Sequence, residues 1–196
     1  MKKYSGLALL AAMLIMLSGC GSEKIVFNEP TVKVSKKGAI SQTIVEKFDK
    51  DYYDADELQD EFNSAIDDFK KGSNEGEITL SDLYTDNGEV FVSLEYSSSE
   101  AAKVFNNEDI FYGTVNDAYD NGYTLDVNLK GVEDGTLIGK SELMEMDKNH
   151  IFIVSSAGIV YTPYKVMFVS AGVEVLGDKE VRVSSDSDGL AYIVMK

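Results

Sequence analysis

Few residues in this 196-residue chain could carry out covalent catalysis. The sequence contains one histidine, His150, and one cysteine, Cys20. A nucleophilic site needs a nucleophile, a base and a group that orients the base, and no Gly-x-Ser-x-Gly motif marks a candidate serine. His150 stands just before an apolar run, which favours a turn-exposed position or a place on an edge strand. The sequence therefore predicts a protein without enzymatic activity.

Motifs for metal and phosphate binding are equally scarce. A structural zinc site usually draws on several Cys and His ligands, and this chain has one of each. Neither a GxxxxGKS/T phosphate-binding loop nor a CxxC redox pair occurs. Aromatic clusters could line a ligand groove, although such residues more often pack at sheet edges: Tyr52-Tyr53, Phe111-Tyr112, and Tyr161 with Tyr164.

The densest group of potential ligands is acidic. Seven carboxylates fall within thirteen residues: Asp49, Asp51, Asp54, Asp56, Glu57, Asp60 and Glu61. Ca²⁺ takes about six to eight oxygen ligands, and extracellular calcium sites are often weak. A weak calcium site is therefore one hypothesis, with these ligands: Asp49, Asp51, Asp54, Asp56 and Asp60. The EF-hand spacing fits poorly, because Asp54 stands where that loop needs Gly, and helix capping with a solvated face explains most of the same residues.

Paired carboxylates could also hydrolyse glycosidic bonds. That chemistry requires two carboxyl groups placed across a cleft. The 34 acidic residues make such a pair available, but their abundance does not place them. A carboxylate-based hydrolase of cell-wall glycans is therefore a further alternative.

Cys20 follows a short apolar run near the start of the chain. Lys2 and Lys3 precede eleven apolar residues, 7–17. A helix of that run would be about 16 Å long at roughly 1.5 Å per residue, whereas a bilayer core is about 30 Å thick. The charged start, the short apolar core and the small residues after it are typical of a secretory signal peptide.

The end of this segment, Leu17-Ser18-Gly19-Cys20, resembles the lipobox of bacterial lipoproteins. The resemblance covers about the first twenty residues. It implies cleavage between Gly19 and Cys20, with a diacylglyceryl lipid attached to the Cys20 sulfur. Two acyl chains anchor a protein stably, so the mature chain is expected on the outer face of the cytoplasmic membrane.

The composition is strongly acidic, with a formal net charge of −16. Such a field repels nucleic acid and anionic lipid head groups, which are recognised through basic patches. With a single cysteine, no disulfide framework is possible, so the exported part must rely on its core. The absence of Trp, the two Pro and the single Arg resemble the residue usage of low-GC Gram-positive bacteria.

One helix is strongly predicted, over residues 54–72. Leu58, Phe62 and Phe69 fall on one face of a helix with Ala65 and Ile66. Asp54 can cap its start, with Glu57 three residues on in a capping-box arrangement. Shorter helices are expected in residues 97–107, capped by Ser97, and in residues 114–123.

Strand-like runs make up most of the remainder. Asn87-Gly88 predicts a tight hairpin between two strands, because both central residues of that turn need positive φ. After Tyr123, short β-rich runs alternate with Gly-containing turns: residues 124–129, 136–144, 150–156, 158–161, 165–170, 173–177, 180–184 and 191–195. The run 173–183 indicates a second hairpin around Gly177-Asp178.

The sequence thus predicts an α+β fold. One long amphipathic helix packs on antiparallel sheet in an N-terminal part, and the C-terminal part is β-rich. The expected organisation is a signal peptide (1–19), a lipidated N-terminus and tether (20–30), an α+β part (31–123) and a β-rich part (124–196), with 31–196 as one continuous domain as the alternative.

These features favour a membrane-anchored extracytoplasmic lipoprotein that binds and does not catalyse. Its expected partners are the membrane, through the lipid on Cys20, and an envelope protein or cell-wall polymer. Weak calcium binding and glycan hydrolysis remain the alternatives.

Overall fold

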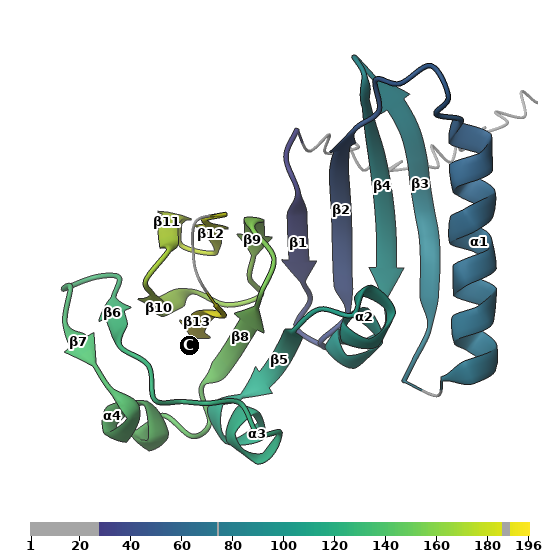
Figure 1. Ribbon diagram of the computed structural model, residues 1–196. Helices are drawn as coiled ribbons and strands as arrows, with labels where there is room; N and C mark the ends of the chain where they lie inside the picture. Colours follow the sequence, from purple (N-terminus) through teal and green to yellow (C-terminus); the bar gives the residue numbers. More distant parts are fainter. Residues whose placement is uncertain (1–27, 74, 186–188) are drawn as a thin grey trace, which may run out of the picture.

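The computed structural model describes residues 28–73, 75–185 and 189–196 (Figure 1). The lipobox-like segment, including Gly19 and Cys20, lies outside the described residues, as does most of the expected tether. Two sheets and several helices make up the fold, so the predicted α+β class is confirmed.

The larger sheet has seven strands. In spatial order they are β11 (Val173–Gly177), β12 (Glu180–Val183), β9 (Gly158–Tyr161), β1 (Thr31–Val34), β2 (Ile40–Lys47), β4 (Glu89–Tyr96) and β3 (Ile78–Asp86). Within the described ranges its neighbours are antiparallel except β1 and β9, which are parallel. β1 therefore joins strands from before and after Tyr123.

The smaller sheet has six strands, all antiparallel to their neighbours. In spatial order they are β5 (Ile110–Thr114), β8 (His150–Val154), β13 (Ala191–Met195), β10 (Val166–Ser170), β6 (Leu129–Gly131) and β7 (Leu137–Ile138). Each sheet combines strands from before and after Tyr123.

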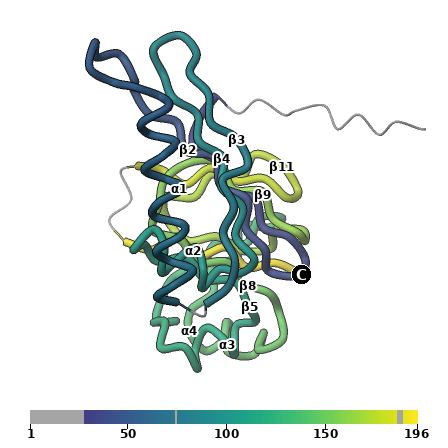
Figure 2. The backbone as a smooth tube through the Cα atoms, turned by 90° about the vertical axis from the view of Figure 1, so that its right-hand side faces the viewer, coloured from purple at the N-terminus to yellow at the C-terminus, as the bar shows by residue number. Residues whose placement is uncertain are grey.

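The helices flank these sheets. They are α1 (Ala55–Gly72), α2 (Ser99–Asn106), α3 (Val115–Asp120) and α4 (Lys140–Glu145). α1 runs alongside β3 in both views, and α3 and α4 lie at the opposite end of the molecule from the β3–β4 turn (Figures 1 and 2). Asp54 precedes α1, and its carboxylate accepts hydrogen bonds from the backbone N–H groups of Asp56 (2.8 Å) and Glu57 (3.1 Å).

Both predicted hairpins form. β3 and β4 meet at Asn87 and Gly88, which have φ values of +50° and +80°, as the tight turn requires. β11 and β12 form the second hairpin, with Gly177 paired to Glu180.

Three local predictions were wrong. The run 136–144 is not one strand, because α4 begins at Lys140. The Glu142 carboxylate accepts the Gly139 N–H at the start of this helix (3.1 Å), and Leu143 of the helix is fully buried. Residues 124–128 are irregular, and Leu125 reaches the core from them. α2 is capped by Ser98 and not by Ser97, because the Ser98 hydroxyl accepts the Ala101 N–H (3.0 Å).

The smaller sheet is buried on both faces at its centre. Alternate side chains of β8 and β13 enter two different hydrophobic clusters. One cluster fills the space against the larger sheet; its members from these strands are Phe152, Val154, Ala191, Ile193 and Met195. The other includes residues of α3 and α4; its members from these strands are Ile151, Ile153, Tyr192 and Val194.

Two buried tyrosines have contrasting surroundings. The Tyr96 hydroxyl donates to Asn106 Oδ1 (2.9 Å) and lies 3.1 Å from Gln42 Oε1, and Asn106 Nδ2 also donates to that Gln42 oxygen (2.8 Å). The Tyr192 hydroxyl is buried and has no hydrogen-bond partner within the described part of the chain. Burial raises the pKa of both phenols.

Tyr96→Phe and Tyr192→Phe form a matched pair, because each removes one buried oxygen. We expect Tyr96→Phe to lower the free energy of unfolding by about 1–2 kcal/mol, since it removes the hydroxyl that donates to Asn106 Oδ1, while Asn106 and Gln42 keep their hydrogen bond to each other. Tyr192→Phe should leave the free energy unchanged or raise it by up to about 1 kcal/mol, because no hydrogen bond is lost. Urea unfolding of both variants measures the two free energies of unfolding. Equal decreases in both variants would contradict the claim that only the Tyr96 hydroxyl is hydrogen-bonded.

Candidate functional site

His150 lies on an inner strand. It is the first residue of β8, which pairs with β5 on one side and β13 on the other, so the predicted edge-strand position was wrong. The four apolar residues that follow it are all buried, and such continuous apolar runs belong to strands covered on both faces. That pattern could have shown the inner position in advance.

The His150 ring is held between two tyrosine rings. Tyr112 of β5 stacks on it with the ring centroids 5.6 Å apart and the planes 19° apart. Tyr164, which follows β9, lies on it with centroids 4.6 Å apart. Lys36 Nζ lies 5.5 Å from the centre of the Tyr164 ring, within the range of a cation–π contact. These contacts fix the orientation of the imidazole.

A pocket of about 310 Å³ lies beside this stack. Four segments far apart in the sequence line it: the β1–β2 turn, the start of α2, the segment from β5 into α3, and strand β8. The polar and aromatic side chains in its lining are Lys36, Lys37, Ser98, Ser99, Tyr112, Thr114, Asp117 and His150. We call this the His150 pocket.

The β1–β2 turn brings the two lysines to the pocket. It is closed by backbone hydrogen bonds from Ser35 N to Ala39 O (2.9 Å) and from Gly38 N to Ser35 O (3.1 Å). Gly38 has a φ of +86°, and a Cβ at this position would lie 3.4 Å from Tyr112 Cδ1. Glycine therefore permits the backbone conformation of the turn, and a Cβ here would be in ordinary van der Waals contact with the Tyr112 ring.

The two serines at the pocket already make structural hydrogen bonds. Ser98 Oγ donates to Glu75 O (3.1 Å) in addition to capping α2, and Ser99 Oγ accepts the Tyr112 N–H (3.2 Å). Within the described residues, no hydrogen bond joins His150 to Ser99 or to Asp117, the carboxylate of the pocket. These three residues share a pocket without the contacts of a catalytic triad.

Asp117 forms the capping box of α3. Its carboxylate accepts hydrogen bonds from the Thr114 N–H (2.9 Å) and hydroxyl (2.7 Å), and the Thr114 hydroxyl accepts the Asp117 N–H (3.0 Å). The hydrogen bonds from Thr114 lower the pKa of Asp117, with a smaller contribution from His150. This carboxylate is thereby committed to the start of α3.

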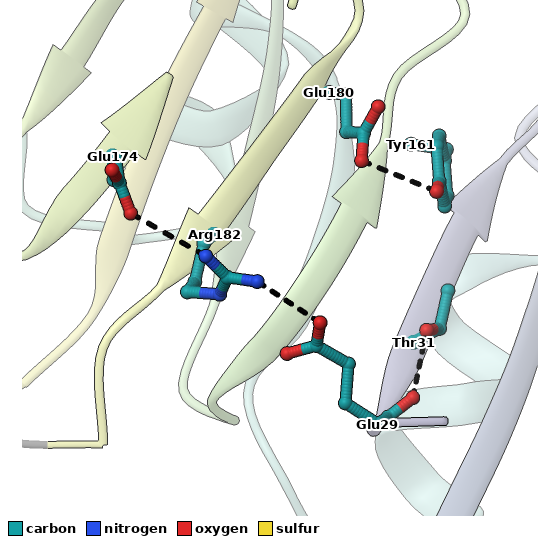
Figure 3. A network of polar contacts seen from close by, with 6 residues as sticks. All are labelled: Glu29, Thr31, Tyr161, Glu174, Glu180 and Arg182. Carbon is teal, nitrogen blue, oxygen red and sulfur yellow. Dashed lines mark hydrogen bonds and ion pairs between the residues drawn. The ribbon is translucent and has the colours of Figure 1, made fainter. Parts of the chain in front are cut away.

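A second polar cluster surrounds Arg182, the only arginine in the sequence (Figure 3). Its guanidinium lies 2.9 Å from Glu29 Oε1 and 3.5 Å from Glu174 Oε2. Glu29 also accepts the Thr31 hydroxyl at its backbone oxygen (2.9 Å). A larger hollow of about 690 Å³ adjoins this cluster. Because both Arg182 contacts are carboxylates of the chain itself, the cluster fastens the segment before β1 to strands β11 and β12.

The acidic segment that follows β2 has other partners. Asp54 caps α1, and Asp49 lies 3.4 Å from Lys50 Nζ. Among the described residues, no group of three or more His, Cys, Asp or Glu side chains lies close enough to hold a metal ion. The carboxylates proposed as calcium ligands are thus not gathered into one site in this structure, and calcium binding stays a prediction. No helix in the described ranges is long and apolar enough to span a membrane.

The other aromatic residues singled out in the sequence lie apart from the pocket. Tyr52 is 76% exposed and packs edge-on against Tyr53, which stacks on Phe48. Phe111 belongs to the cluster beneath α3 and α4. Only Tyr112 and Tyr164 reach the His150 stack. Lys36 and Lys37 were not predicted as site residues, because no local signal in the sequence links their turn to β8.

Comparison of the chain with family models, curated proteins and solved structures finds no match. The chemistry of the site must therefore be argued from the contacts above.

Asp117→Asn tests the capping box beside the pocket. We expect it to lower the free energy of unfolding at neutral pH by about 0.5 kcal/mol, a small value because the carboxylate is exposed and screened. A carboxyl group whose pKa is lower in the folded state stabilises the fold at pH values above its ordinary pKa of about 4. That contribution is lost as the pH falls through the lower folded-state pKa. The difference in the free energy of unfolding between wild type and Asp117→Asn should therefore disappear at acidic pH.

The matched control is Asp120→Asn in the last turn of the same helix. A negative charge there opposes the helix dipole, so this variant should be neutral or stabilising. Thermal unfolding as a function of pH gives both curves. If the stability difference between wild type and Asp117→Asn is the same at neutral and acidic pH, Asp117 does not stabilise α3 through its charge.

Proposed function

We propose that this chain is a lipid-anchored binding module outside the cytoplasmic membrane, without catalytic activity of its own. The anchor is the diacylglyceryl group implied by the lipobox-like segment that ends at Cys20. Binding is assigned to the His150 pocket, and this pocket is the observation that carries the proposal.

The construction of the pocket supports a binding role. Its walls come from four separate segments, so its shape depends on the whole fold and not on one loop. The imidazole is immobilised by two ring contacts, and rigid, pre-positioned side chains lower the entropic cost of binding. The serines are committed to structural hydrogen bonds, which favours binding over nucleophilic chemistry.

The position of the pocket suits a protein held by its N-terminal end. The chain enters the fold at Glu29, beside Arg182, and the Lys36 turn lies at the other end of β1. Four strand residues separate these points by roughly 13 Å, at about 3.3 Å per residue. The entry point and the pocket are thus at opposite ends of one strand. This arrangement favours a ligand that approaches from the side facing away from the membrane.

We also propose that residues 31–196 act as one continuous domain and that α1 is its amphipathic cover. Strands from before and after Tyr123 share both sheets, which supports a single unit. The side chains of α1 that pack against the main hydrophobic cluster share one face: Leu58, Phe62, Ile66 and Phe69. Such a stripe binds the helix to the sheet and stiffens the long strands that lead to the pocket.

Cys20→Ala tests the anchor. The variant should lose metabolic labelling by a palmitate analogue, and it should either be released from the membrane or keep its signal peptide uncleaved, since two acyl chains supply the membrane affinity of the mature chain. Ser18→Ala is the matched control, because it keeps both the cysteine and a small residue before Gly19. Acyl labelling that persists in Cys20→Ala would refute lipidation at this residue.

A further inference from the structure

We propose that the His150 pocket binds the phosphate group of a small soluble ester. This assignment rests on the proposed binding function of the pocket and adds the chemical class of its ligand.

The first argument is local charge. Lys36 and Lys37 are both exposed at the pocket, and within the described residues neither forms an ion pair. By contrast, Lys50, Lys103 and Lys165 each lie against a carboxylate. In a chain with a net charge of −16, two adjacent lysines without acidic partners form a distinct positive site. Asp117 offsets one of these charges, and one of its two oxygens, Oδ2, accepts both hydrogen bonds from Thr114.

The second argument is the supply of hydrogen-bond donors. The His150 ring nitrogens make no hydrogen bond within the described part of the chain, although the ring is fixed between Tyr112 and Tyr164. The start of α2 also lines the pocket, and the helix dipole favours an anion there. Two lysines, an imidazole and the start of a helix thus line one hollow, together with the Asp117 carboxylate.

The third argument separates phosphate from carboxylate. Planar carboxylates are best matched by the fork of an arginine, whereas lysines act as point charges and are common phosphate ligands. The only arginine in the sequence, Arg182, belongs to the other cluster and is paired with Glu29 and Glu174. The donors of the His150 pocket surround a compact, multiply charged group better than a planar one. A pocket of about 310 Å³ can hold a small ester, but it is too small to enclose a long polymer segment.

A phosphate group could come from a soluble ester or from a phospholipid head group. The net charge of −16 disfavours close approach of the whole chain to an anionic membrane. The pocket also lies at the end of β1 opposite to the entry of the chain at Glu29. Both observations favour the soluble ester.

Glycerol phosphate is a suitable probe, titrated at constant ionic strength into the isotope-labelled full chain in a non-ionic detergent. We expect saturable shifts of the Gly38 and Ser99 amide resonances and of the His150 ring resonances. Lys36→Gln/Lys37→Gln should weaken binding at least about tenfold, because it removes both ammonium groups. His150→Gln is a second variant; it should also weaken binding while leaving the lysines in place.

Lys70→Gln/Lys71→Gln is the matched control. It removes two adjacent lysines from the end of α1 and makes the same change in net charge, so its affinity for glycerol phosphate should stay within about twofold of wild type. Equal weakening in both double variants, or no saturable shifts in wild type, would overturn the proposal.

Mixed micelles containing phosphatidylglycerol distinguish the two sources of phosphate. If they produce the lysine-dependent shifts and glycerol phosphate does not, the ligand is a lipid head group and the soluble ester is refuted. Acyl labelling of Cys20 is measured separately, so a failure of phosphate binding leaves the anchor intact, and a failure of the anchor leaves phosphate binding intact.

Discussion

Burial of β8 and β13 on both faces is the constraint on which the rest of the fold depends. All five residues of β13, and the last four of β8, are buried. Side chains alternate between the two faces of a strand, so these strands need an apolar layer on each side. The larger sheet supplies one layer, and α3, α4 and the segment between α3 and β6 supply the other. His150 marks the point where this burial ends, because it is the first residue of β8 and only half-buried. The pocket therefore forms at the edge of the strands that are buried on both faces.

β1 joins the two halves of the larger sheet. It pairs with β2 on one side and with β9 on the other. At Gly158, where β9 starts, a Cβ would collide with the Pro30 carbonyl oxygen, so the close approach of the two strands requires glycine. The contact of Arg182 with Glu29 adds a charge pair at the same place. The segment that enters the fold is thus held by backbone pairing first and by a partly exposed ion pair second, which contributes less.

The features predicted correctly from the sequence are those fixed by neighbouring residues. Asn87-Gly88 sets the β3–β4 turn through the φ values that it permits, and Asp54 caps the helix that follows it. The sheet order could not be predicted, because β1 pairs with β9, which lies more than a hundred residues away. α4 was missed because a short run with Leu137, Ile138 and Leu143 suits a strand and a helix equally until packing decides. The pocket was missed for the same reason as the sheet order, since Lys36 and His150 come together only through β1, β5 and β8.

A small positive pocket can function on so acidic a chain because electrostatic interactions are short-ranged in salt. At physiological ionic strength the screening length is about 8 Å. Charges on α1, which carries most of the acidic segment after β2, lie on the far side of β3 from β1 and therefore act weakly at the Lys36 turn (Figure 1). Within the pocket the nearest charges dominate, and these are Lys36, Lys37 and the committed carboxylate of Asp117. A strongly acidic surface favours solubility and repels anionic groups at longer range, whereas the proposed recognition is assigned to the few groups around His150.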